Sequence, residues 1–296
     1  MTDAVLTDRR WVSAHLFTSA PLDLVIPELL PELLAELRDA ELIDGFFFLR
    51  HWQAGPHLRL RLRIAAPEHI RAIRTGRAVQ AVQAALARHG AAQFRRRPSV
   101  RPFTEAEYQE TAERLSALEP ESAALALAPN DSLRFVRYQP EHAKYGTGRA
   151  LAEVEEHFVR CSELALAALA DRWSAADRQA YCFALLVAAG AAARGAPAGT
   201  PAARLYQEHR SRLLPVAAAV RGPSDGSPAA RWAESVRHLG SQLSCLPGES
   251  APGPNLVGNH CAHLACNRLG VAPAQEALLR ELAAFAVAEL DGPAHP

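Results

Sequence analysis

The sequence predicts an α+β fold in which an N-terminal ferredoxin-like antiparallel sheet with helices is followed by a C-terminal helical bundle. Strand-like and helix-like patterns alternate through the N-terminal half in the order β-α-β-β-α-β, which is typical of that sheet. From Leu151 onward the strand patterns vanish and helical periodicity remains. We therefore divide the chain into a sheet region at 1–146 and a helical region at 147–296, and we expect one compact unit.

Strands are predicted where apolar or aromatic residues alternate or cluster between turn residues. The segment 11–18 alternates, the segment 46–51 is rich in aromatic residues, and the segment 57–64 follows a Gly-Pro turn. Two shorter segments, 93–97 and 133–138, have a similar composition. These segments are the expected strands of the sheet.

Helices are predicted where apolar residues recur every three or four positions. In the sheet region these windows are 24–42, 68–89 and 105–127, and the first carries a stripe of leucines. In the helical region, several of the windows are separated by pieces rich in Gly, Pro and Ser, so a bundle is expected there. Its windows are 151–170, 175–193, 202–220, 229–246, 256–269 and 274–290.

Composition and charge exclude several classes of function. The 296 residues include 32 basic and 32 acidic side chains, so no global field attracts nucleic acid, and we expect no direct nucleic-acid binding. No apolar run approaches the roughly 18 residues that span a bilayer, and the polar N-terminus does not resemble a signal peptide. The five cysteines form no Cys-x-x-Cys pair. We therefore expect a reduced, cytoplasmic protein that does not enter a membrane.

The segment HLRLRLRI at 57–64 alternates basic and apolar residues. Successive side chains of a strand point to opposite faces, so the basic residues share one face and the apolar ones face a core. The basic residues are His57, Arg59, Arg61 and Arg63. One interpretation is an anion-binding face for a carboxylate, a phosphate or an acidic peptide. The other is a solvated or salt-bridged sheet face.

Arg50 follows the apolar run FFFL and precedes the arginine strand by a short turn. A hairpin between the two strands would add Arg50 or His51 to the cationic surface. The alternative is a snorkelling arginine at the end of an aromatic run.

The segment YQPEHAKYG at 138–146 places Glu141 three residues before Lys144. On a helical turn these two side chains share one face. They form either an ordinary surface ion pair or a carboxylate that orients a cation in a pocket.

The segment NHCAHLACNRLG at 259–270 places His260, His263 and Asn267 on neighbouring faces of one helix. Histidine is the natural acid or base near neutral pH. The alternative interpretation is a pair of core or hydrogen-bonded histidines. Cys261 and Cys266 also raise the possibility of zinc, but one helix cannot wrap four ligands around an ion, so we expect no metal.

Taken in order along the chain, these motifs resemble one family. The run RHWQAGPHLRLRL at 50–62 resembles an aromatic-Arg-Tyr, Gly/Pro turn, His-x-Arg-x-Arg signature, with His51 in place of Tyr. The segment YQPEHAKYG resembles Tyr-x-x-Glu-x-x-Arg-Tyr-Gly, and HLACNRL at 263–269 resembles His-Met-x-x-Asn-Arg-Leu. The family is that of the C-terminal elimination domain of lantibiotic dehydratases, also called thiopeptide-type bacteriocin biosynthesis proteins.

The resemblance implies a lyase that acts on a ribosomal precursor peptide. In that family, glutamate esterified to a Ser or Thr is removed by β-elimination, which leaves dehydroalanine or dehydrobutyrine. The residues that match the elimination site are Arg50, Glu141, Lys144 and His263, with Lys144 in place of the family's Arg. The substrate-binding residues we expect are His57, Arg59, Arg61, Arg63, Tyr138, Tyr145 and Asn267. We expect no cofactor.

Two other functions stay open. Related chains of thiopeptide pathways join two dehydroalanines in a formal [4+2] cycloaddition that makes a pyridine and releases the leader peptide. Retention of Arg50, Glu141 and His263 favours elimination, whereas Lys144 and His51 point the other way. The other possibility is a non-catalytic subunit that binds the leader peptide. Besides the precursor peptide, the expected partners are a separate glutamylating dehydratase subunit and a second copy in a homodimer.

Overall fold

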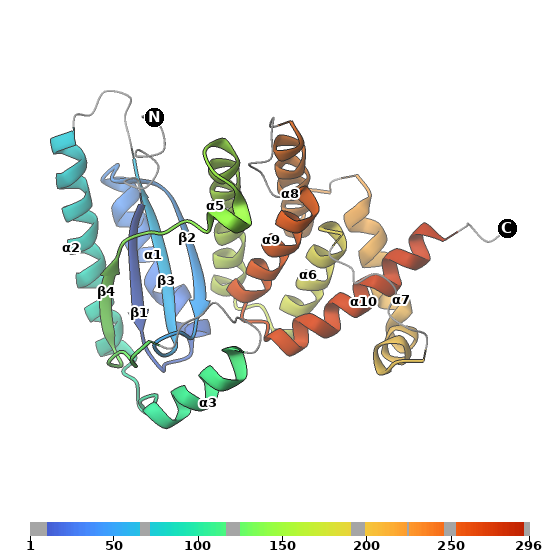
Figure 1. Cartoon of the computed structure of the whole chain (residues 1–296), viewed down its shortest axis with the longest axis horizontal. Coiled ribbons are helices and arrows are strands. Elements are labelled where there is room, and N and C mark those ends of the chain that lie inside the picture. Colours follow the sequence, from blue (N-terminus) through green and yellow to red (C-terminus); the bar gives the residue numbers. More distant parts are fainter. Residues whose placement is uncertain are drawn as a thin grey trace. The chain divides into compact units, whose positions relative to one another are not determined.

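The structure, a computed structural model, describes the chain except for both termini and several internal segments. The described ranges are 11–65, 72–116, 125–190, 199–223, 225–245 and 253–292. They fall into two units, which we call the sheet unit (Met1–Pro140) and the helical unit (Glu141–Pro296), and each is described by itself (Figure 1).

The sheet unit contains a four-stranded sheet in which all neighbours are antiparallel, in the order β2-β3-β1-β4. Its strands are β1 (Trp11–Phe17), β2 (Ile43–His51), β3 (His57–Ile64) and β4 (Ser132–Val136). Its helices are α1 (Leu22–Asp39), α2 (Ala72–Arg96) and α3 (Glu105–Ser116). This arrangement confirms the predicted α+β fold with an N-terminal antiparallel sheet.

One face of the sheet forms the core with α1 and α2 (Figure 1). The apolar side chains of β3 that alternate with its arginines are at most 3% exposed, and they are Leu58, Leu60, Leu62 and Ile64. α2 approaches this face closely at Gly90, where an added Cβ would lie 3.6 Å from the Leu16 side chain. The opposite face is therefore the one that carries the basic residues of β3.

The predicted strand at 93–97 is wrong, because α2 continues through Arg96. Val82, Leu86 and Gln93 are all buried, and their spacing continues one helical stripe through the segment that was expected to be a strand. The predicted helix at 105–127 begins correctly at Glu105, but α3 ends at Ser116 and 125–129 has no helix. Residues 117–124 lie outside the described part of the chain, as does the expected start of α2 before Ala72.

The helical unit confirms the predicted helices to within a few residues at each end, save that 191–193 and 246 lie outside the described ranges. After the short α4 (His142–Tyr145) come α5 (Arg149–Ala170), α6 (Ala175–Ala188), α7 (Pro201–Arg221), α8 (Pro228–Ser244), α9 (Pro254–Arg268) and α10 (Pro273–Asp291). Local chemistry starts several of them. The Ser174, Thr200 and Ser227 hydroxyls each accept a hydrogen bond from the backbone N–H three residues later. No described helix has the length and apolar character needed to cross a membrane.

Candidate functional site

The sheet unit presents a cationic face, which we define by His57, Arg59, Arg61 and Arg63 of β3. Aromatic rings also line this face. The Arg61 guanidinium lies 5.8 Å from the ring centre of Tyr138, a distance at which a cation is attracted to a ring. Arg63 makes an ion pair with an Asp44 carboxylate oxygen at 2.5 Å. The face is thus partly salt-bridged and partly lined by aromatic rings. The ion pair fits the salt-bridged interpretation, and anion binding by this face stays a prediction.

Three histidine rings meet at one end of this face. The rings of His15 and His57 stack with centroids 4.7 Å apart, and His51 lies 5.4 Å from His57. Burial and the charges of neighbouring arginines lower the pKa of His15 and of His51 to about 2. Burial lowers the pKa of His57 to about 4, against the opposing effect of a backbone hydrogen bond. All three rings are therefore neutral near pH 7.

His57 is held in one tautomer and in turn orients Arg59. Its Nδ1 lies 2.8 Å from the Gly55 carbonyl oxygen and so carries the proton. Its Nε2 accepts a hydrogen bond from Arg59 Nε at 3.2 Å, and Arg59 also donates to Gln53 Oε1 at 3.2 Å. A neutral His57 is a requirement of this arrangement, because a protonated ring could not accept from a guanidinium.

Arg50 does not lie on the cationic face. In the β2–β3 register Arg50 is opposite Leu58, whereas His51 is opposite His57, so the hairpin adds His51 to that face. Arg50 lies on the other face and makes a 2.6 Å ion pair with Asp23 in the first turn of α1.

The helical unit opens with the segment that carries Glu141 and Lys144. Lys144 Nζ lies 2.7 Å from a Glu141 carboxylate oxygen, and both side chains are about half exposed. Tyr145 is buried against Phe158, with ring centroids 5.2 Å apart, and lies 6.0 Å from the ring of His260. Burial raises the pKa of the Tyr145 hydroxyl, so this residue stays protonated.

His263 on α9 contacts a buried carboxylate. Its Nδ1 lies 2.7 Å from one oxygen of Glu276, while the other oxygen accepts from Arg280 Nε at 2.9 Å and Nη2 at 2.7 Å. The Glu276 side chain is 7% exposed, whereas that of His263 is 46% exposed. One ring nitrogen of His263 is therefore held by a buried carboxylate, while about half of the side chain stays exposed. An acid–base catalyst has this kind of geometry.

His260 is influenced electrostatically both by the Glu141–Lys144 pair and by His263. Burial lowers its pKa, the positive charge of Lys144 lowers it further, and the negative charge of Glu141 opposes the change. Smaller contributions come from His263 and Arg280. Lys144, Glu141 and His263 thus share one electrostatic neighbourhood around His260. Asn267 follows His263 by one helical turn on α9.

The helical unit also buries several polar groups. Arg268 is fully buried, donates from Nε to Ser162 Oγ at 3.0 Å and lies 5.4 Å from the Phe158 ring centre. Burial raises the pKa of the Cys161 and Cys261 thiols, so neither is an activated nucleophile. Among the described residues, no group of three or more His, Cys, Asp or Glu side chains is placed to hold a metal ion.

A family model described as the C-terminal region of lantibiotic biosynthesis dehydratases matches residues 11–287. The chain belongs to this family. The family assignment confirms the resemblance seen in the ordered sequence motifs. Among curated proteins, none matches the chain significantly.

Solved structures with the family fold include two that the match covers almost completely. TbtD, a pyridine synthase from thiomuracin biosynthesis, is 22% identical with a TM-score of 0.71, and the match covers 96% of this chain and 100% of TbtD. TsrL is 18% identical with a TM-score of 0.54, and 94% of each chain is covered. The tRNA-dependent lantibiotic dehydratase MibB from Microbispora sp. 107891 is 18% identical with a TM-score of 0.59, over 97% of this chain and 29% of MibB. At these identities the likeness establishes the fold and not the reaction.

Three residues of these clusters were not anticipated from the sequence: His15, Glu276 and Arg280. Glu276 and Arg280 are four apart in the first turns of α10, after a helix-ending Gly270 and a Pro273 at the helix start, which is a recognisable ion-pair pattern. The pattern does not indicate which side chain of α9 the carboxylate contacts. His15 gives no sequence signal beyond its place on an alternating strand.

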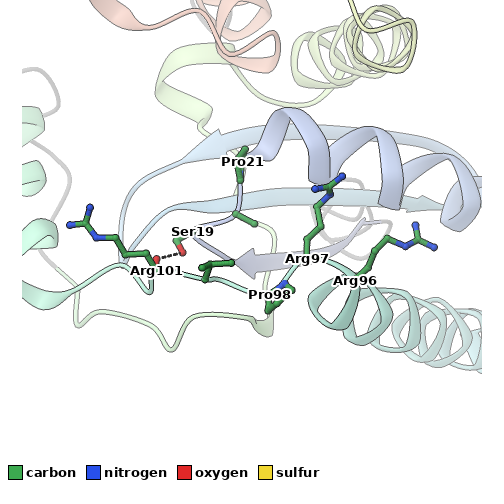
Figure 2. Close-up of a pocket in the computed structure, with 8 residues that line it drawn as sticks. Ser19, Pro21, Arg96, Arg97, Pro98 and Arg101 are labelled. Atoms are coloured by element: carbon green, nitrogen blue, oxygen red, sulfur yellow. Dashed lines mark hydrogen bonds between the residues drawn. The ribbon is translucent and has the colours of Figure 1, made fainter.

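A separate cavity of about 320 Å³ lies in the sheet unit where α1 begins and α2 ends (Figure 2). Figure 2 shows Arg96, Arg97 and Arg101 around it. Each of these arginines has a glutamate partner: Arg97 contacts both oxygens of Glu28 at 2.5–2.6 Å, and the other two pair with Glu32 and Glu107. Because these charges are compensated and none of the expected site residues lines the cavity, we assign no binding role to it.

Proposed function

We propose that this chain removes glutamate by β-elimination from glutamylated Ser or Thr of a ribosomal precursor peptide, leaving dehydroalanine or dehydrobutyrine. The observation that supports it most is the His263–Glu276 contact, in which an accessible imidazole is anchored by a buried carboxylate. β-Elimination requires a base that removes a weakly acidic Cα proton, and this arrangement supplies one.

Each group near His260 has a part in the proposed reaction. His263 takes the Cα proton through Nε2, and the electron pair of the broken Cα–H bond forms the Cα=Cβ bond. The Cβ–O bond breaks, and glutamate leaves as a carboxylate. Lys144, oriented by Glu141 at 2.7 Å, stabilises negative charge on the enolate and on the leaving carboxylate.

The sheet unit has a binding role in this proposal. The cationic face, with Tyr138, binds acidic or carboxylate groups of the precursor peptide, and neutral His57 keeps Arg59 directed for that contact. Arg50 is proposed to act on the glutamyl group, although in the structure Asp23 holds it on the opposite face. We further propose that a separate glutamylating dehydratase supplies the esterified peptide. We also propose that the protein acts in the cytoplasm and that it forms a homodimer.

His263→Ala should reduce elimination by at least about 100-fold, the effect usual for removing a general base. The measurement is single-turnover loss of glutamate from a chemically glutamylated peptide, followed by mass spectrometry. His238→Ala, an exposed histidine on α8, serves as the control and should keep full activity. Undiminished elimination by His263→Ala would refute the proposal.

The second candidate is a pyridine synthase that joins two dehydroalanines in a formal [4+2] cycloaddition and releases the leader. The reason to consider it is that TbtD, a pyridine synthase, shares the fold of this chain over its full length. Incubation with a peptide that already carries dehydroalanines distinguishes the two, because a macrocycle plus free leader would overturn elimination.

A non-catalytic leader-binding subunit would instead lose peptide affinity in Arg59→Ala and Arg61→Ala and would be unaffected by His263→Ala.

A further inference from the structure

Glu276 is a buried carboxylate that touches the proposed base. Its side chain is 7% exposed, and both of its oxygens are engaged, one by His263 and the other by Arg280. Burying a carboxylate costs free energy unless charged hydrogen bonds compensate it. The two partners do so here, and they leave the Glu276 carboxylate with a fixed orientation toward α9.

The local structure explains how the carboxylate reaches α9. Gly270, with φ of 73°, ends α9 in the left-handed conformation, and the Val271 N–H donates to the Cys266 carbonyl at 3.0 Å. This tight turn starts α10 at Pro273 and places Glu276 in its first turn. A carboxylate is favoured there by the positive end of the helix dipole.

We propose that Glu276 is a positioning residue that holds His263 in the tautomer protonated at Nδ1, so that the lone pair lies on Nε2. This inference rests on the proposed function, because His263 matters for catalysis only if it transfers a proton. A carboxylate accepts but cannot donate, so the Nδ1 that lies 2.7 Å from it must carry the proton. The same carboxylate stabilises the imidazolium that forms when Nε2 takes a proton.

Arg280 keeps Glu276 in the form that this role requires. Burial raises the pKa of the Glu276 carboxyl, but the hydrogen bonds and charges of His263 and Arg280 outweigh it, and the pKa is lowered overall. The carboxylate is therefore ionised near neutral pH. Arg280 also approaches the Asn259 side chain and carbonyl at 3.4 Å, which fixes the guanidinium against α9.

The test compares Glu276→Gln with Glu281→Gln, the same substitution one residue beyond Arg280 on α10. The amide introduced by Glu276→Gln has nearly the same shape as the carboxylate but can donate as well as accept, so it no longer imposes the tautomer. The first readout is the neutral tautomer of His263, measured by long-range ¹H–¹⁵N correlation spectra of the full chain at mildly alkaline pH. The second is single-turnover elimination with kcat and KM determined separately.

The expected result is a shift of His263 in Glu276→Gln toward a mixture of tautomers, with kcat reduced about 100-fold and KM nearly unchanged. Glu281→Gln should match the wild-type protein, and Glu276→Asp should restore part of both readouts because it keeps the charge. If Glu276→Gln fails to fold, Glu276→Asp carries the test against the wild-type protein. Its shorter side chain weakens the same contact, so a partial shift of the tautomer and a partial loss of kcat are expected, and no change in either would overturn the inference.

The tautomer measurement needs no substrate, so it separates this inference from the proposed function. An unchanged tautomer in Glu276→Gln overturns the inference, and so does an unchanged kcat in that variant when the wild-type protein is active. An inactive wild-type protein that shows the Nδ1-protonated tautomer, lost in Glu276→Gln, would instead refute elimination and support the structural role of Glu276.

Discussion

Acidification from about pH 7 to about pH 4.5 should destabilise the chain by several kcal/mol through the three histidines of the sheet unit. His15 and His51 have folded-state pKa values of about 2, and His57 has one of about 4. The unfolded chain binds protons near the ordinary histidine value of about 6.5. The contribution of these three histidines to the free energy of unfolding is therefore complete above that pKa, and it declines as the pH falls toward the folded-state pKa values.

The size of this effect follows from the width of the pH window. Each pH unit below about 6.5 costs about 1.4 kcal/mol for a histidine that stays neutral in the folded chain. At about pH 4.5, His51 and His57 therefore each lower the free energy of unfolding by roughly 2.5 kcal/mol. His15 is less deeply buried, and its contribution is smaller because solvent screens it. Urea unfolding followed at closely spaced pH values measures the decline.

Substitution identifies which groups cause the decline. His57→Gln should lower the number of protons taken up on unfolding by up to one, and so make the free energy of unfolding less dependent on pH. The same substitution at the exposed His238 should leave this slope unchanged. An unaltered slope in His57→Gln would mean that this ring is protonated in the folded chain. That result would contradict the hydrogen bond in which its Nε2 accepts from Arg59.

The fold was predictable because its signals are local. The alternation of β3, with leucines on one face and arginines on the other, follows directly from strand geometry, and the helices of the helical unit begin where capping residues and prolines occur. The error at 93–97 arose because a short basic segment has no period of its own, while the buried stripe of α2 that extends to Gln93 becomes visible only over several turns.

The candidate site was predictable only in part, because its partners come from separate elements. His263 stands out by its spacing within one helix, but Glu276 becomes its partner only after the turn at Gly270 brings α10 back toward α9. Arg50 illustrates the converse. From the sequence, the hairpin could add either Arg50 or His51 to the cationic surface, because neighbouring residues of a strand point to opposite faces. Only the strand register shows that His51 is the one added, and Asp23 of α1 pairs with Arg50 on the other face.

Lys144→Met should lower the rate of elimination about 100-fold, a loss comparable to removing one electrostatic donor from an active site. The fold should tolerate the change, because the Lys144–Glu141 pair is about half exposed and such pairs contribute less than about 1 kcal/mol to stability. The matched control is Arg149→Met, which removes the cation of another exposed ion pair in the helical unit and should keep the wild-type rate.

Lys144→Arg tests the geometry as distinct from the charge. An ammonium group contacts a carboxylate as a point charge, whereas a guanidinium binds it through two parallel hydrogen bonds. If Lys144 contacts the glutamyl carboxylate, the Arg variant should keep kcat within a few-fold and lower KM for the glutamylated peptide, while its affinity for the same peptide without glutamate should not change. Equal rates in Lys144→Met and the wild-type protein would remove Lys144 from the mechanism. A Lys144→Arg variant that loses elimination as completely as Lys144→Met would show that the site requires the compact ammonium group, which the elimination geometry proposed here does not predict.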